Sequence, residues 1–241
     1  MSENLISTEN PLLRVHNLSK SQNGLSILHD IRFSLRRGEK IGLLGENGAG
    51  KTSLLRCIVG YWLPELGYCE VEGNRVTAES IETRAKLGYM PERVPLYPNL
   101  TAREHLQLAV VLKGRSGDYS SSDWHDIECQ YGISEIAHRP SRYFSKGYRQ
   151  RLGLAMAMLI TPELLILDEP TSGLDPAQIV AVRDLLNHLN PTQGMIMSSH
   201  QLSEVHSVCD RILVIHKGRL VLDEPVSGGD IEAQFLAVTA S

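Results

Sequence analysis

A glycine-rich segment at residues 45–52 constrains the fold of this chain more than any other feature. It follows the short apolar run at residues 40–44, and it leads into residues 50–60, which have the spacing of a helix. The pattern GxxxxGK[ST] is met by Gly45, Glu46, Asn47, Gly48, Ala49, Gly50, Lys51 and Thr52. A buried strand, a glycine turn and a helix in this order predict a unit of parallel α/β structure, with the turn at the carboxyl edge of the sheet.

The same segment predicts a nucleotide phosphate site. Glycines let successive backbone N–H groups point inward as an anion-binding nest, and the helix that follows adds the positive end of its dipole. Lys51 can reach the β- and γ-phosphates, Thr52 offers a hydroxyl to Mg²⁺, and Ser53 is a further donor to phosphate. The alternative is a glycine-rich turn that binds nothing, which the flanking strand and helix argue against.

A second candidate site element is an apolar run that ends in two carboxylates. Residues 164–167 are all apolar, and Asp168 and Glu169 follow directly. A buried parallel strand would deliver both acids to the ligand-binding edge of the sheet. Asp168 would hold Mg²⁺, directly or through water, and Glu169 could polarise an attacking water as general base. Taken alone, the segment fits a strand running into an acidic turn equally well; the phosphate loop favours the metal–nucleotide site.

Strands and helices alternate along the rest of the chain, which favours a largely parallel sheet covered on both faces. A mostly helical stretch from Thr101 to about residue 160 interrupts the alternation, opened by a capping box of Thr101 and Glu104. We expect strands at 27–35, 67–76, 164–167, 195–199, 212–215 and 219–222, with Gly73 and Asn74 as a turn signal inside the second of these. We expect helices at 124–131, 148–159, 175–189 and 201–208, a polar loop at 114–123, and a short helix and tail at 230–241. Asp175 and Pro176 are an N-cap and first-turn pair.

Composition excludes several classes of protein. The formal net charge of the 241 residues is −4, so no direct nucleic-acid binding is expected. The four cysteines form no CxxC pair, which indicates a reduced cytosolic protein without a zinc site or disulfides. Residues 1–10 lack the pattern of a signal peptide, and the best apolar run, residues 152–160, is too short to span a membrane.

Five further segments match one family in order, so the chain resembles the ATP-binding cassette (ABC) ATPase subunit. LGYMPE at 87–92 is similar to the entry to the Q-loop, FSKGYRQRL at 144–152 to the signature motif, SGLD at 172–175 to the D-loop, SSH at 198–200 to the histidine switch, and residues 210–219 to the closing hairpin. The resemblance covers residues 12–225. It implies an α/β fold: a P-loop NTPase core with a mostly parallel sheet, an N-terminal antiparallel β subdomain and an inserted helical subdomain at about 93–160, between a tail at 1–11 and a short C-terminal helix or tail at 226–241.

The resemblance also implies roles for single residues. Ser145 and Gly147 would act in trans, on ATP held by Lys51 of a second ABC subunit, so that two cassettes sandwich two ATP molecules. His200 would contact the γ-phosphate and hold the attacking water with Glu169. Asp175 would lie across the dimer seam; a role as helix cap alone is an equally good interpretation.

Three positions depart from the family pattern. The signature is FSKGY rather than LSGGQ, which resembles the subfamily that works with ABC-2-type permeases, mostly exporters. Glu92 stands at the family's glutamine, where it can approach Mg²⁺ and water. Gln22 stands where the family has an aromatic residue that stacks on adenine, a change that predicts weaker ATP binding. His16 is a possible substitute.

These expectations define a function: an ATP- and Mg²⁺-dependent ATPase subunit that drives a separate transmembrane permease from the inner face of the cell membrane. Val94, Leu96 and Tyr97 could line a groove for a short helix of that permease, or could be loop anchors. Two other functions stay open from the sequence. One is a non-transport ABC ATPase acting on ribosomes or DNA, and the other is a weakly active regulatory cassette.

Overall fold

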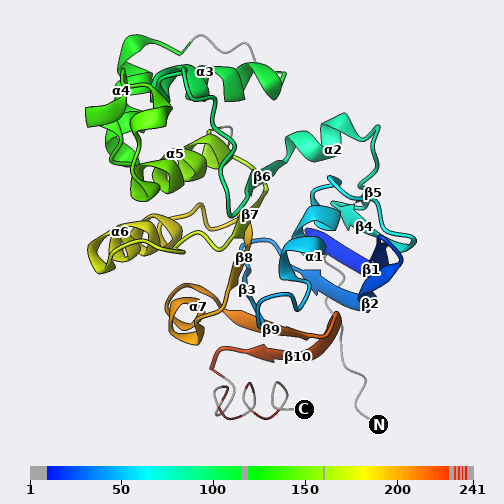
Figure 1. The fold of residues 1–241 in the computed structure, drawn as a ribbon. Helices are drawn as coiled ribbons and strands as arrows, with labels where there is room; N and C mark the ends of the chain where they lie inside the picture. The colour runs from blue at the N-terminus through cyan, green and yellow to red at the C-terminus, as the bar shows by residue number, and fades with distance from the viewer. Residues whose placement is uncertain are drawn as a thin grey trace.

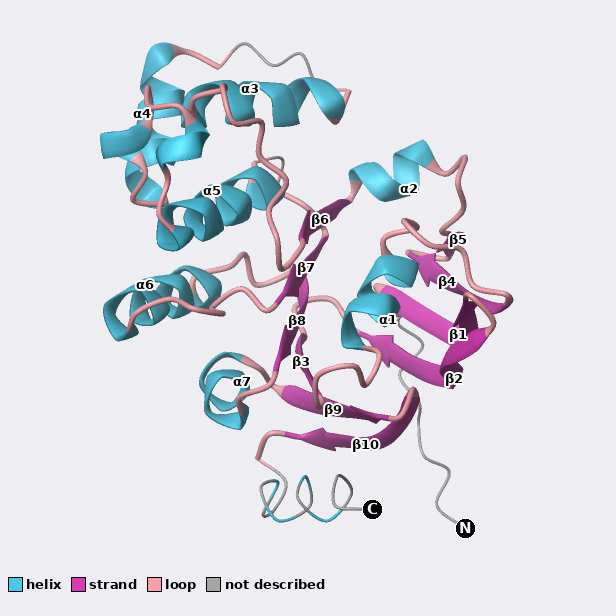
Figure 2. Ribbon diagram, viewed as in Figure 1, coloured by secondary structure: helices cyan, strands magenta, loops and turns pink. Residues whose placement is uncertain are grey.

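Two sheets and a group of helices make up the described part of the chain (Figures 1 and 2). The computed structural model describes residues 10–114, 119–159, 161–227, 231, 233, 235 and 237. Among them, the larger sheet has the strand order β10-β9-β3-β8-β7-β6 and is parallel except for β10, which runs antiparallel to β9. Its strands are β3 (Lys40–Leu44), β6 (Leu87–Met90), β7 (Leu164–Asp168), β8 (Gly194–Ser199), β9 (Arg211–His216) and β10 (Arg219–Pro225).

The smaller sheet is antiparallel, with the order β2-β1-β4-β5. Its strands are β1 (Leu13–Gln22), β2 (Leu25–Leu35), β4 (Leu66–Val71) and β5 (Asn74–Arg75). The predicted fold class, a mostly parallel core with an antiparallel sheet and inserted helices, is therefore confirmed. The segment predicted as a strand at 67–76 with a turn signal at Gly73 and Asn74 is a hairpin of two strands, because Glu72 (φ 51°) and Gly73 (φ 76°) take left-handed conformations that reverse the chain.

The helices divide into three groups (Figure 1). They are α1 (Lys51–Ile58), α2 (Ile81–Ala85), α3 (Ala102–Leu112), α4 (Ser121–Gln130), α5 (Lys146–Met158), α6 (Pro176–Asn187) and α7 (Leu202–Val208). On one face of the larger sheet, α1 lies with the smaller sheet. The helices α6 and α7 cover the other face, and α3, α4 and α5 gather beyond β6. The short α2 stands apart from these groups and directly precedes β6 in the chain. The capping boxes of Thr101 and Asp175 are both present, as predicted.

Two regions differ from the sequence prediction. The start of α4 lies inside the predicted polar loop 114–123, because Ser120 and Asp123 form a capping box that begins the helix at Ser121. The short elements α2 and β6 were not predicted. Much of the predicted helix at 230–241, and most of the tail at 1–11, lie outside the described residues.

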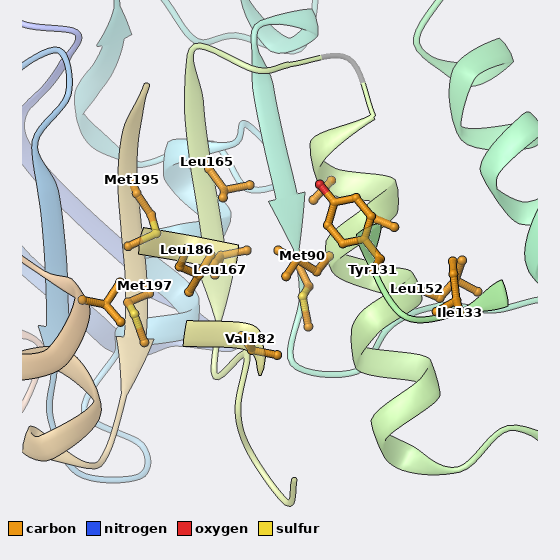
Figure 3. Close-up of a cluster of buried hydrophobic side chains, with 14 of the residues drawn as sticks. Met90, Tyr131, Ile133, Leu152, Leu165, Leu167, Val182, Leu186, Met195 and Met197 are labelled. Atoms are coloured by element: carbon orange, nitrogen blue, oxygen red, sulfur yellow. The ribbon is translucent and has the colours of Figure 1, made fainter. Parts of the chain in front are cut away.

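The side chains of β7 explain how the core positions a site. All five of its residues are buried, and alternate ones point to opposite faces. Leu164 and Ile166 pack with α1 and the smaller sheet, whereas Leu165 and Leu167 pack with the helices on the other face. Figure 3 shows the second cluster, where Leu165, Leu167, Met195 and Met197 lie near Val182 and Leu186 of α6. Packing on both faces holds the carboxyl end of β7 in place.

An ion pair joins α3 to α4. Nε and Nη2 of Arg103 each donate to one carboxylate oxygen of Glu128 at 2.7 Å, and Glu128 is 2% exposed. A buried two-point pair of this kind leaves an uncompensated charge when one partner is removed.

We therefore predict that Glu128→Gln lowers the free energy of unfolding by roughly 2–4 kcal/mol. Denaturant unfolding of the full chain measures the change. Arg32→Gln is the matched control, since Arg32 pairs with Asp30 on the exposed surface and its loss should cost less than about 1 kcal/mol. Equal changes in the two variants would contradict the structural role given to Glu128.

Candidate functional site

The carboxyl ends of three adjacent parallel strands meet at one edge of the larger sheet. In register, Leu44 of β3 lies beside Ser199 of β8, and Ser198 lies beside Asp168 of β7. The glycine-rich loop leaves β3 at this edge and enters α1. Residues far apart in the sequence are thus brought to one place by the order of the strands.

The glycine-rich loop has a backbone that favours glycine at two positions. Gly48 has φ 85° and Gly50 has φ 112°, and a Cβ on Gly50 would lie 2.9 Å from Leu28 Cδ2. Gly50 is the N-cap of α1, which has no side-chain cap and no acidic residue in its first turn. The first N–H groups of the helix are therefore available to an anion, with the helix dipole behind them.

The Lys51 ammonium lies over this loop. Its Nζ donates to the carbonyl oxygens of Gly45 at 2.7 Å and Glu46 at 3.3 Å. It also lies 3.5 Å from Oε1 of Glu169, and the residue is 7% exposed. The cation is held at the loop by contacts that a bound phosphate would replace.

Asp168 is the buried acid of the site. Its Oδ1 accepts hydrogen bonds from the hydroxyls of Ser198 at 2.7 Å and Thr52 at 3.2 Å. Burial raises its pKa, the two hydroxyls oppose this rise, and the negative charges of Glu92 and Glu169 add to it. A hydroxyl and a carboxylate facing each other are oxygen ligands that Mg²⁺ prefers, so Thr52 and Asp168 fit the expected metal. The contact of Ser198 with Asp168 was not predicted, because it depends on the register in which β8 pairs with β7.

The Glu169 carboxylate lies between the Lys51 ammonium and the His200 imidazole. Its Oε2 is 2.8 Å from Nδ1 of His200, and its Oε1 faces Lys51. The backbone of Glu169 is left-handed (φ 49°), and its N–H donates to the Ser198 hydroxyl at 2.9 Å. A non-glycine residue in this sparsely populated conformation is typical of functional sites. The side chain that follows this turn reaches Lys51 and His200.

These groups surround a cavity of about 590 Å³. The lining residues are Ile27, Glu46, Asn47, Gly48, Gly50, Lys51, Thr52, Ser53, Glu92, Glu169, Ser172 and His200. Ile27 and Ser172 were not predicted to face it. Their positions depend on strand pairing and on a turn, neither of which leaves a local signal.

Neither candidate for contact with a base lines this cavity. Gln22 is exposed at the end of β1, where it pairs with Leu25. His16 packs against Tyr68, with ring centroids 4.4 Å apart. Ile27 instead contributes a large apolar side chain to the lining.

Ser145, Gly147 and Asp175 form a separate group. The Ser145 hydroxyl caps α5 by accepting from the N–H of Tyr148 at 3.3 Å, and Asp175 caps α6 by accepting from the N–H of Gln178 at 2.9 Å. The Gln178 side chain also covers Gly147, where an added Cβ would lie 2.6 Å from it. Within the described residues, the cavity lining includes none of the three predicted residues.

Two negative findings apply to the residues that the structure describes. None of the helices there has the length and apolar character needed to cross a bilayer. The four cysteines are all free, and Cys57, Cys69 and Cys209 are buried, where the loss of hydration raises their thiol pKa values.

Comparisons with known proteins identify the family of the chain. The ABC transporter family model matches residues 28–172. The chain is 38% identical over 224 residues to the uncharacterised ABC transporter ATP-binding protein YhcH of Bacillus subtilis, an alignment that covers 92% of this chain and 72% of that protein. It is 33% identical over 221 residues to the lantibiotic transport ATP-binding protein SrtF of Streptococcus pyogenes, which covers 91% of this chain and 93% of that protein. A solved ATP-binding subunit of an ABC transporter superposes with a TM-score of 0.84 at 28% identity, covering 95% of this chain and 99% of that one. The chain therefore belongs to the ABC transporter family, as an ATP-binding and ATP-hydrolysing subunit.

Proposed function

We propose that this ATPase binds ATP with Mg²⁺ in the cavity at Lys51, hydrolyses it with Glu169 and His200, and so drives a separate membrane permease that exports its cargo. The observation that carries the proposal is the position of Glu169. One of its oxygens faces the phosphate-loop lysine and the other faces His200, across a single cavity. An acid, a lysine and a histidine in this arrangement suit the transfer of a phosphoryl group to water.

Binding of the phosphates begins with an exchange of partners at Lys51. The γ-phosphate takes the place of the Gly45 carbonyl and Glu169 at the ammonium, and the N–H groups at the start of α1 hold the other phosphate oxygens. Thr52 and Asp168 would hold Mg²⁺, and Glu92, which lines the same cavity, could add a further oxygen ligand. When bound, the metal neutralises charge on the β- and γ-phosphates.

Hydrolysis then requires a base for the attacking water. Once Lys51 has turned to the phosphate, the Glu169 carboxylate is free to take a proton from a water whose oxygen attacks the γ-phosphorus, while the bond to the ADP oxygen breaks. His200 Nδ1 orients that carboxylate. The exposed side of the His200 ring faces the cavity, where it can contact the γ-phosphate.

A second cassette completes each site in this proposal. Ser145 and Gly147 lie at the N-terminus of α5, where a serine hydroxyl and unpaired N–H groups suit a γ-phosphate. Their separation from the cavity of their own chain supports an action on ATP bound to the other chain of a dimer. Ile27 provides an apolar surface for the base in place of the missing aromatic residue.

Two adjoining cavities support docking of the permease; we call them the docking groove. One of about 410 Å³ and one of about 460 Å³ share Tyr89, Pro95 and Met156. Tyr97 is exposed (60%), as Tyr61 is (72%). Val94 lines the cavity of about 410 Å³ and also packs on Gly153, while Leu96 and Tyr97 line the cavity of about 460 Å³. An apolar, concave surface of this kind fits a short helix of a membrane protein, which would place the ATPase at the inner face of the membrane.

The first prediction concerns Glu169→Gln. This change removes the proton acceptor and keeps the side-chain shape, so ATP turnover should fall by roughly 10²–10⁴ while ATP binding is preserved. Phosphate release and equilibrium nucleotide binding are the two measurements. Turnover near that of the wild type would exclude Glu169 as the base.

The second prediction separates the two interpretations of Asp175. Asn is as good an N-cap as Asp, so Asp175→Asn should keep the stability of α6, whereas Asp175→Ala should lose about 1 kcal/mol. If the carboxylate acts across the dimer seam, Asp175→Asn lowers turnover without changing the denaturation midpoint. Normal turnover in Asp175→Asn would leave the residue as a helix cap only.

A further inference from the structure

A separate cavity of about 350 Å³ lies where the last turns of three helices come together. Ile127 of α4, Met158 of α5 and Leu185 of α6 are among its lining residues, and α5 lies between α4 and α6 (Figure 1). Gln193, which directly precedes β8, also lines it, so the cavity lies at the opposite edge of the larger sheet from the phosphate loop. Its volume is within the range of cavities that bind small molecules.

The side chain of Gln193 has one hydrogen-bond acceptor without a partner. The residue is 3% exposed, and its Nε2 donates to the carbonyl oxygen of Pro162 at 2.8 Å. This bond fixes the orientation of the amide, because Oε1 in the same place would face another acceptor. Within the described residues, no group donates to Oε1, which is buried. A buried polar atom of this kind calls for an explanation, and a donor on a bound molecule supplies one.

His188 provides a second acceptor at the same cavity. Its Nδ1 lies 2.7 Å from the carbonyl oxygen of Asp184, so Nδ1 carries the proton of the neutral ring and donates it to that oxygen. Nε2 is then an acceptor, on an exposed residue that lines the cavity. Both side chains therefore suit a molecule that brings a hydrogen-bond donor.

The electrostatics of the cavity favour a donor without a full charge. Three helices end here, and the negative ends of their dipoles disfavour an anion. Among the described residues that line the cavity, none is an aspartate, glutamate, lysine or arginine, so a cation would enter without a counter-charge. Burial raises the pKa of Tyr131, another lining residue, to about 12, as expected where a charged form is poorly solvated.

The rest of the lining favours an apolar, flat molecule. Leu154, Leu185 and Leu189 provide aliphatic surface. Tyr131 adds an aromatic ring and Met158 a thioether, and both of these groups pack well against an aromatic ring.

We propose that this cavity binds a small neutral molecule with an apolar ring system and an N–H or O–H donor, which pairs with Oε1 of Gln193. The site goes beyond the proposed ATPase cycle and does not depend on it. Its position suits regulation, because α5 and α6 begin at Ser145 and Asp175, the residues proposed for the dimer seam, and both helices end at this cavity. A ligand here would contact the same two helices that carry those residues.

The test compares two isomeric probes on the full chain. 3-Methylindole and 1-methylindole have the same size and the same ring system, but only 3-methylindole has an N–H donor. Titration followed by ligand-observed NMR gives the dissociation constant of each, and 3-methylindole should bind at least about fivefold more tightly. Equal affinities would overturn the hydrogen bond to Gln193, and the absence of binding by either isomer at millimolar concentration would overturn the site.

A substitution at the rim locates the bound probe. Leu189 is half-buried and lines the cavity, so Leu189→Trp should fill part of the volume and weaken the binding of 3-methylindole at least about tenfold. Ile81→Trp is the matched control, since Ile81 is 72% exposed on α2 and is not among the residues that line this cavity. Binding that is unchanged in Leu189→Trp places the probe elsewhere and refutes the proposal. The comparison of isomers uses the unaltered chain, so it decides the proposal even where Leu189→Trp lowers stability.

Discussion

The carboxyl end of β7 is the point on which the rest of the site depends. The strand is apolar and buried on both faces, so its last residues cannot shift without disturbing two hydrophobic clusters. Asp168 is held there by the hydroxyls of Ser198 and Thr52, and Glu169 turns through a left-handed conformation toward Lys51 and His200. A rigid core thus carries two adjacent acids into different environments, which is how neighbouring carboxylates come to perform different tasks.

The segment after β6 connects this site to the outer surface. Glu92 lines the nucleotide cavity, and the next residue, Arg93, lines the docking groove. Val94 then fixes the segment by packing on Gly153 of α5. Because Glu92 and Arg93 are consecutive residues, a change at the phosphates that moves Glu92 would also move Arg93 directly. The short path gives a physical reason why ATP binding and the permease could affect each other.

Features that are determined by a few consecutive residues could be predicted from the sequence. The glycine loop, the apolar β7 with its two acids, and the caps at Thr101 and Asp175 each occupy only a few consecutive residues. The short elements α2 and β6 were not predicted. The predicted start of α4 lay too far along the chain, because the capping residue Ser120 is followed by further serines. Ile27 and Ser198 contribute through the pairing of distant strands, which a single sequence does not encode locally. The roles of Ser145 and Gly147 stay predictions, because they depend on a second chain.

The central claim is that each catalytic site combines the Lys51 side of one chain with the Ser145 side of another. The direct measurement is ATP turnover in a mixture of Lys51→Ala and Ser145→Ala chains, compared with each variant alone. In a mixed dimer, one site would hold an intact Lys51 from one chain and an intact Ser145 from the other, so the mixture should be clearly more active than either variant. Turnover no higher than the average of the two variants would contradict a shared site.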